Sequence, residues 1–190
     1  MTDSEAPVHI EPPLAGTEEE TLAGSLERQR ATFAWKTAGL DAAALHATVG
    51  ASSMTLAGLL KHLAGVEAIY FSWRLRGRDP GAPWNTVDWD ADADWDWRTA
   101  AEDSPEELYR LWNDAAARSR ESLAAALDDG GLDQLLPAAG GEVGSLRRML
   151  IDLIEEYARH VGHADLIRES IDGLVGEDPP GRAPSAAPEY

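Results

Sequence analysis

The chain has 190 residues, of which 34 are acidic and 16 are Lys or Arg, so its formal net charge is -18. This charge opposes binding to nucleic acids and to anionic membranes, because both need a positive protein surface. No apolar run approaches the roughly 20 residues that span a bilayer, and residues 1–15 lack the basic and apolar regions of a secretory signal. We therefore expect a cytoplasmic protein with no nucleic-acid or membrane partner.

The chain contains no cysteine. Disulfides, thiolate zinc sites and a cysteine nucleophile are thereby excluded, and any catalytic thiol has to arrive with a substrate. Proline-rich segments at residues 1–16 and 174–190 are expected to be tails or extensions that lie on the surface. The remaining residues, 17–173, fit one domain of common size.

Four amphipathic patterns with apolar residues at helical spacing follow in chain order. They predict helices over residues 17–38, 54–77, 104–127 and 146–172. No segment shows the sustained alternation of a strand, so we expect an all-α fold in which the four helices form a bundle. The longest connection, residues 78–103, favours a crossover between the second and third helices, because short loops join antiparallel neighbours.

The third helix has the clearest start. Pro105 occupies the first helical position, and Glu107 follows Ser104 by three residues, which is the spacing of a capping box. We therefore expect Ser104 to be the N-cap.

Polar side chains with metal-binding chemistry lie on the inward faces of two of these helices. His62 shares the apolar face of the second helix, and Glu156, His160 and His163 form one stripe on the fourth. A buried carboxylate without a partner costs several kcal/mol, on the order-of-magnitude scale for desolvated ions, and a cation offsets that cost. Two histidines and one glutamate also form a recurring catalytic set that leaves metal positions open. We therefore predict a divalent metal site at His62, Glu156 and His160.

A structural interpretation of the same residues stays open. In it His62 is a core histidine with ordinary hydrogen bonds, and Glu156 pairs with Arg159 or another basic residue. His163 fits an outer partner of the metal ligands, a substrate contact, a proton shuttle or a structural hydrogen bond equally well. Contact with an anionic substrate is open to Tyr157, Arg159 and Arg168, but we favour pairing on the helix surface with Glu155, Asp165 or Glu169. We assign His9 and His46 no role.

The segment of residues 84–97 alternates Asp and Trp. It does not fit a calcium-binding loop, because no register places glycine and glutamate where that loop requires them. We expect a solvated loop held in place by its tryptophans. The functional alternative is a lid over the metal site, with Trp84 or Trp89 lining a pocket for a substrate.

Two runs, LLKHLAGVEAIYF and EEYARHVGHADLIRESIDG, resemble the DinB/YfiT-like metalloenzyme superfamily, particularly the branch related to mycothiol-dependent maleylpyruvate isomerase. The resemblance implies an up-up-down-down four-helix bundle. It also implies that a divalent metal is held by a histidine of the second helix and by two residues one turn apart on the last, here His62, Glu156 and His160. Zinc is the expected ion, with nickel, manganese and iron as alternatives.

The resemblance further implies transfer or isomerisation that uses a low-molecular-weight thiol, mycothiol or bacillithiol. The Arg-rich and Ala-rich composition, typical of high-GC genomes, favours mycothiol. Because the chain lacks the further C-terminal domain of the isomerase, we expect an S-transferase or a related isomerase acting on a small electrophile. A non-catalytic metal-containing binding protein and a metal-free structural protein stay open as alternatives, as does a homodimer.

Overall fold

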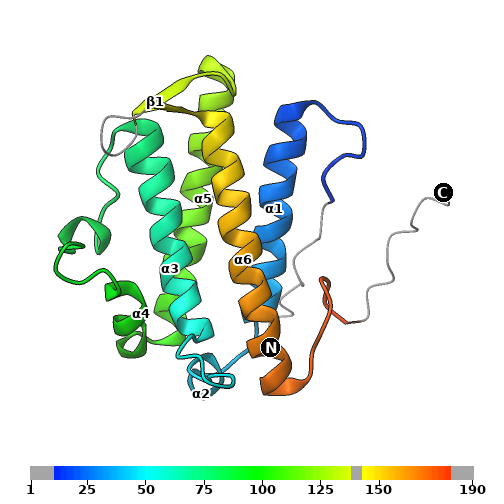
Figure 1. Ribbon diagram of the computed structural model, residues 1–190, viewed down its shortest axis with the longest axis vertical. Coiled ribbons are helices and arrows are strands. Elements are labelled where there is room, and N and C mark those ends of the chain that lie inside the picture. Colours follow the sequence, from blue (N-terminus) through cyan, green and yellow to red (C-terminus); the bar gives the residue numbers. More distant parts are fainter. Residues whose placement is uncertain (1–10, 138–142, 181–190) are drawn as a thin grey trace.

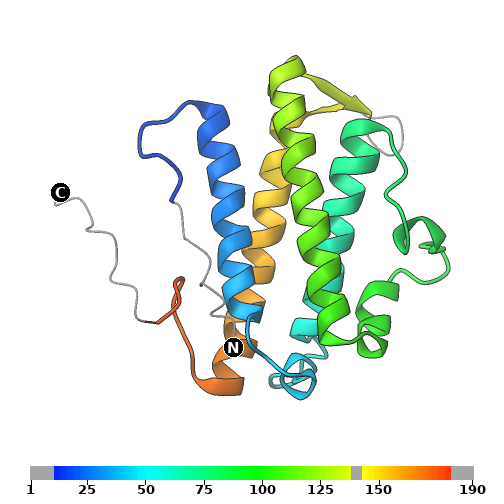
Figure 2. The same ribbon diagram turned by 180° about the vertical axis from the view of Figure 1, so that it is seen from behind.

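The computed structural model describes residues 11–137 and 143–180, so much of both expected tails, with His9, lies outside the described residues. Four long helices lie side by side, as Figures 1 and 2 show from opposite sides. They are α1 (Glu18–Thr37), α3 (Leu56–Ala68, continued by the π-helical turn Ile69–Arg74), α5 (Pro105–Gly130) and α6 (Leu146–Asp172). The structure is mostly helical, which is compatible with the all-α prediction, and each predicted helix corresponds to one of these.

A short antiparallel hairpin joins α5 to α6 and was not predicted. It pairs β1 (Leu135–Pro137) with β2 (Val143–Ser145). Strands of three residues are too short to show an alternating pattern, and two of their apolar side chains, Leu135 and Val143, are exposed. The hairpin therefore has no sequence signal of the kind that burial of one face produces.

Side-chain contacts at the helix ends give the direction of each helix. Arg147 pairs with Glu18 at the start of α1 and α6 (2.6 Å), and Lys36 pairs with Asp165 near their ends (2.7 Å), so these two helices are parallel. Tyr109, near the start of α5, donates to the carbonyl of Thr37 at the end of α1, which makes α5 antiparallel to α1.

The same reasoning makes α3 and α5 parallel, since Lys61 pairs with Asp103 before α5 begins and Arg76 donates to the carbonyl of Ser122 farther along it. In Figure 1 the four helices thus run down, up, up and down in chain order. The crossover prediction is confirmed. The up-up-down-down order is wrong, because it needs two long return connections and the chain has one, between α3 and α5.

The crossover segment, residues 77–104, contains three short helical elements in place of the expected loop. These are η2 (Trp84–Thr86), α4 (Trp95–Thr99) and η3 (Ala100–Glu102), whereas α2 (Ala42–Leu45) lies between α1 and α3. Trp84 is buried, and a Cβ on Gly65 of α3 would lie 3.0 Å from its ring. Tryptophan side chains therefore hold the segment against α3, as the preferred interpretation expected.

An ionic network crosses the core between the helices. Arg30 of α1 donates from two nitrogens to the carboxylate of Glu67 of α3 (2.7 and 2.6 Å), and both side chains are fully buried. Tyr157 of α6 donates to the same carboxylate (2.6 Å) and accepts from the indole N–H of Trp112 of α5 (3.0 Å). The network connects all four long helices through hydrogen bonds made in a low-dielectric interior.

The predicted capping box at the start of α5 is present. The Ser104 hydroxyl accepts from the backbone N–H of Glu107 (3.3 Å), whose carboxylate accepts from the N–H of Ser104 (2.9 Å). We expect Ser104→Ala to lower the free energy of unfolding by about 1 kcal/mol, the usual contribution of an N-cap. Urea denaturation measures this loss. Ser122→Ala, inside the same helix, is the control and should cause no comparable loss.

Candidate metal centre

The three predicted ligands come together between α3 and α6. His62 Nε2 lies 3.0 Å from Glu156 Oε1, and His160 Nε2 lies 3.2 Å from the same oxygen. One ligand atom from each residue lies within 4.8 Å of the other two. The spacing that predicted this cluster is also its cause: Glu156 and His160 are one helical turn apart on α6, so both side chains face His62 on α3.

The cluster lies at the edge of the core. The side chain of His160 is 8% exposed and that of His62 19%, whereas that of Glu156 is 32% exposed. The histidine rings are therefore held by packing on most sides, while the carboxylate stays accessible from outside. A site of this kind can admit a small molecule next to its ligands.

Each histidine has a further partner behind it. Asp96 Oδ2 of α4 lies 2.7 Å from His62 Nδ1, and the Nδ1 atoms of His163 and His160 lie 3.3 Å apart. The indole of Trp97 stacks on the His62 ring, with centroids 4.5 Å apart and planes 23° apart. Both rings consequently turn their Nε2 atoms toward Glu156 and away from these partners.

The electrostatics favour an ionised carboxylate in the cluster. Hydrogen bonds from His160 and His62 hold the pKa of Glu156 well below its usual range. Burial by itself lowers the pKa of His62, but its hydrogen bonds to Asp96 and Glu156 outweigh burial and raise the pKa to about 9. Burial and the neighbouring His160 lower the pKa of His163. A cation that displaced the proton of His62 Nε2 would meet one carboxylate oxygen and two imidazole nitrogens, a donor set that suits zinc and similar ions.

A family model for mycothiol-S-transferase (MST) matches residues 21–173. The chain belongs to the mycothiol S-transferase family. The match contains His62, Glu156 and His160, and it confirms the resemblance to the DinB/YfiT-like superfamily, to which this family belongs. A search of curated proteins finds none that matches this chain. None of the helices among the described residues has the length and hydrophobicity needed to cross a membrane.

In this member of the mycothiol S-transferase family, other residues that the sequence offered as substrate contacts lie apart from the cluster. Tyr157 is fully buried in the core network, and Arg168 pairs with Asp172 and donates to the carbonyls of Lys36 and Ala38. The favoured prediction of surface pairs is therefore wrong for Tyr157, which points inward. An ion pair of Glu156 with Arg159 is absent among the residues that the structure describes, where Glu156 pairs with the two histidines.

Sequence reasoning missed Asp96 and Trp97 as neighbours of the cluster. Asp96 is one of five acidic residues that alternate along the crossover segment, and the sequence does not mark which of them is buried. A sequence signal for the position of Trp97 lies on α3. Gly58 precedes His62 by one turn, and a Cβ there would lie 2.9 Å from Trp97, so the glycine leaves room for the indole.

We expect Gly58→Ala to disturb the centre from a distance. The added methyl group displaces the Trp97 ring, because an indole has no flexible end that could move aside. His62 then loses its stacking partner, and metal affinity should fall while helix content is kept. Titration with zinc in competition with a chromophoric chelator measures this. Gly162→Ala is the control, because nothing lies within 4 Å of a Cβ at that position of α6.

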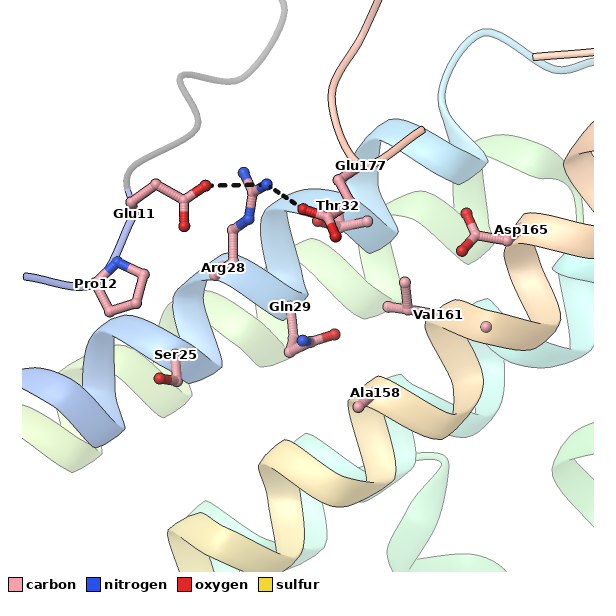
Figure 3. Close-up of a pocket in the computed structure, with 11 residues that line it drawn as sticks. Glu11, Pro12, Ser25, Arg28, Gln29, Thr32, Ala158, Val161, Asp165 and Glu177 are labelled. Carbon is pink, nitrogen blue, oxygen red and sulfur yellow. Dashed lines mark hydrogen bonds and ion pairs between the residues drawn. The ribbon is translucent and has the colours of Figure 1, made fainter. Parts of the chain in front are cut away.

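A separate cavity of about 380 Å³ lies between α1 and α6, lined from α6 by Ala158, Val161, Gly162 and Asp165. Figure 3 shows Arg28 beside it, paired with Glu11 and Glu177. None of the three candidate metal ligands lines this cavity. It is therefore not an extension of the metal centre.

Proposed function

We propose that this protein is a metal-dependent S-transferase that joins the thiol of mycothiol to a small electrophile, on a DinB-like four-helix bundle. The metal is held by His62, Glu156 and His160, and zinc is the expected ion. The observation that carries the proposal is the meeting of three ligand atoms from two helices within 4.8 Å, inside the region that matches the mycothiol S-transferase family.

The residues fit a catalytic metal better than a structural one. Three protein ligands leave a coordination position open for water or substrate. The Glu156 side chain is 32% exposed, so solvent reaches the cluster at this ligand. A divalent ion bound there supplies thiol activation, since coordination lowers the pKa of a thiol. The absence of cysteine from the chain means that no internal thiol competes for this position.

The remaining chemistry falls to the chain itself. Ionised Glu156 contributes negative charge, which favours binding of the cation. His163 steadies His160 through the contact of their Nδ1 atoms, and burial and the neighbouring His160 lower the pKa of His163, which favours its neutral form. In the transfer, a sulfur–carbon bond forms, the leaving group departs with the electron pair of the bond that breaks, and the thiol proton passes to solvent.

The test is turnover by the metal-loaded protein. Untagged protein is assayed for bound zinc, nickel, manganese and iron, and is then incubated with mycothiol and a panel of chloro- and bromo-electrophiles. We expect accelerated formation of the conjugate, slower with bacillithiol, and none with His62→Ala. His46→Ala, a histidine outside the cluster, serves as the control. Bound metal without acceleration on any electrophile would favour the binding protein, and no metal affinity at all would reject the centre.

A further inference from the structure

Asp96 presents a buried carboxylate to the back of the metal centre. It is 5% exposed and belongs to α4 in the crossover segment. One carboxylate oxygen accepts from His62 Nδ1 (2.7 Å), and the other accepts from the backbone N–H of Trp97 (2.9 Å). Both oxygens therefore have a donor, and the His62 ring is the only side chain among these donors.

This contact is energetically significant for both partners. A carboxylate withdrawn from water is costly unless a positive charge or several donors compensate it. Among residues 11–137 and 143–180, no Lys or Arg forms an ion pair with Asp96, and the side chain that contacts its carboxylate is His62. The lysine of α3, Lys61, pairs with Asp103 instead. Asp96 thus depends on His62, and the orientation of His62 depends on Asp96.

Asp96 contacts the side of the His62 imidazole that faces away from the candidate metal position, so it is not itself a metal ligand. It binds Nδ1, whereas Glu156 lies at Nε2, and these two ring nitrogens point in different directions. A carboxylate that accepts from Nδ1–H leaves Nε2 as the atom that can bind a metal, and it makes that atom a stronger donor. Trp97, the next residue, stacks on the same ring and fixes its plane.

We propose that Asp96 is a positioning residue of the metal centre, which holds the His62 ring with Nδ1 protonated and Nε2 directed at the site shared with Glu156 and His160. The inference rests on the proposed function for its metal. It also gives the crossover segment a role, because Asp96 and Trp97 both belong to α4. The orientation of His62 on α3 therefore depends on the segment that connects α3 to α5.

The experiment compares Asp96→Asn with Asp94→Asn. The two variants change charge and shape identically, but Asp94 is exposed at the start of α4. We expect Asp96→Asn to weaken zinc binding by about 10- to 100-fold, the usual effect of losing an outer partner of a metal ligand. The visible spectrum of the cobalt-substituted protein should change as well, since it reports ligand geometry. Asp94→Asn should leave both unchanged.

Proton NMR of the metal-free wild-type protein tests the inference without metal or turnover. A hydrogen-bonded Nδ1 proton of His62 gives a downfield resonance, expected in wild type and Asp94→Asn and missing in His62→Gln and Asp96→Asn. Absence of this resonance from the wild type, or unchanged zinc affinity and cobalt spectrum in Asp96→Asn, would overturn the positioning role. If the wild type shows the resonance and binds zinc more tightly than Asp96→Asn but does not turn over any electrophile, the proposed function is rejected and the positioning role stands.

Discussion

Glu67→Leu is expected to lower the free energy of unfolding by about 3–5 kcal/mol, the usual cost of removing one partner of a buried ion pair. Glu67 and Arg30 are both fully buried and share two hydrogen bonds, so the substitution leaves the buried guanidinium with only the partly exposed Glu27 as an ion-pair partner among the described residues. It also removes the acceptor of the Tyr157 hydroxyl. Urea denaturation followed by circular dichroism measures the loss.

The double variant Arg30→Met/Glu67→Leu is the matched control. It removes both charges and keeps similar volume, and such replacements are often neutral or stabilising. We therefore expect it to recover much of the stability lost in Glu67→Leu. A loss of less than about 1 kcal/mol in the single variant, the range of exposed pairs, would contradict the importance of this network.

Acid sensitivity provides an independent measure of the same pair. Burial by itself raises the pKa of Glu67, but the charge and hydrogen bonds of Arg30 outweigh burial and lower it. The stability that ionised Glu67 contributes is therefore present above the unfolded-state pKa, about 4.3 for glutamate, and is lost as the pH falls through the lower folded-state value. Below about pH 4, the wild type should lose more stability with falling pH than the double variant.

The parts of the fold that local sequence determines were predictable. Ser104, Pro105 and Glu107 marked the start of α5, because capping requires partners only three residues apart. Glu156 and His160 could be paired with each other for the same reason, since one helical turn fixes their relation. Only the choice of His62 as the third residue required contact between two helices, and there the inward face of α3 was sufficient guidance.

Features that depend on long-range packing were not predictable. Glu67 is buried because Arg30, 37 residues earlier, meets it in the core, and a helical glutamate is usually solvated. Asp96, inside α4, is buried, whereas Asp94, which precedes that helix, is exposed, although both belong to the same run of alternating Asp residues. The predicted order of helix directions was likewise wrong. The direction of each helix depends on which connection runs back along the length of the bundle, and amphipathic patterns do not contain that information.

At the metal centre, we expect Glu156→Gln to weaken zinc binding by more than about 100-fold, beyond the range typical of outer partners such as Asp96. The substitution replaces the only carboxylate of the cluster, whose one oxygen contacts both histidines, by a neutral amide. A neutral amide cannot replace the charge that compensates the cation. Competition with a chromophoric chelator measures the affinity. The fold should persist, because the Glu156 side chain is 32% exposed.

Glu155→Gln supplies the matched control, since it makes the same change at the adjacent, exposed position of α6. Equal losses in both variants would indicate that the overall negative charge of the protein attracts the ion and that Glu156 is no ligand. We expect Glu156→Gln to lose zinc affinity while Glu155→Gln does not. The loss should also exceed that of Asp96→Asn, because Glu156 binds the metal whereas Asp96 orients a histidine. The reverse order would contradict the assignment of Glu156 as a ligand.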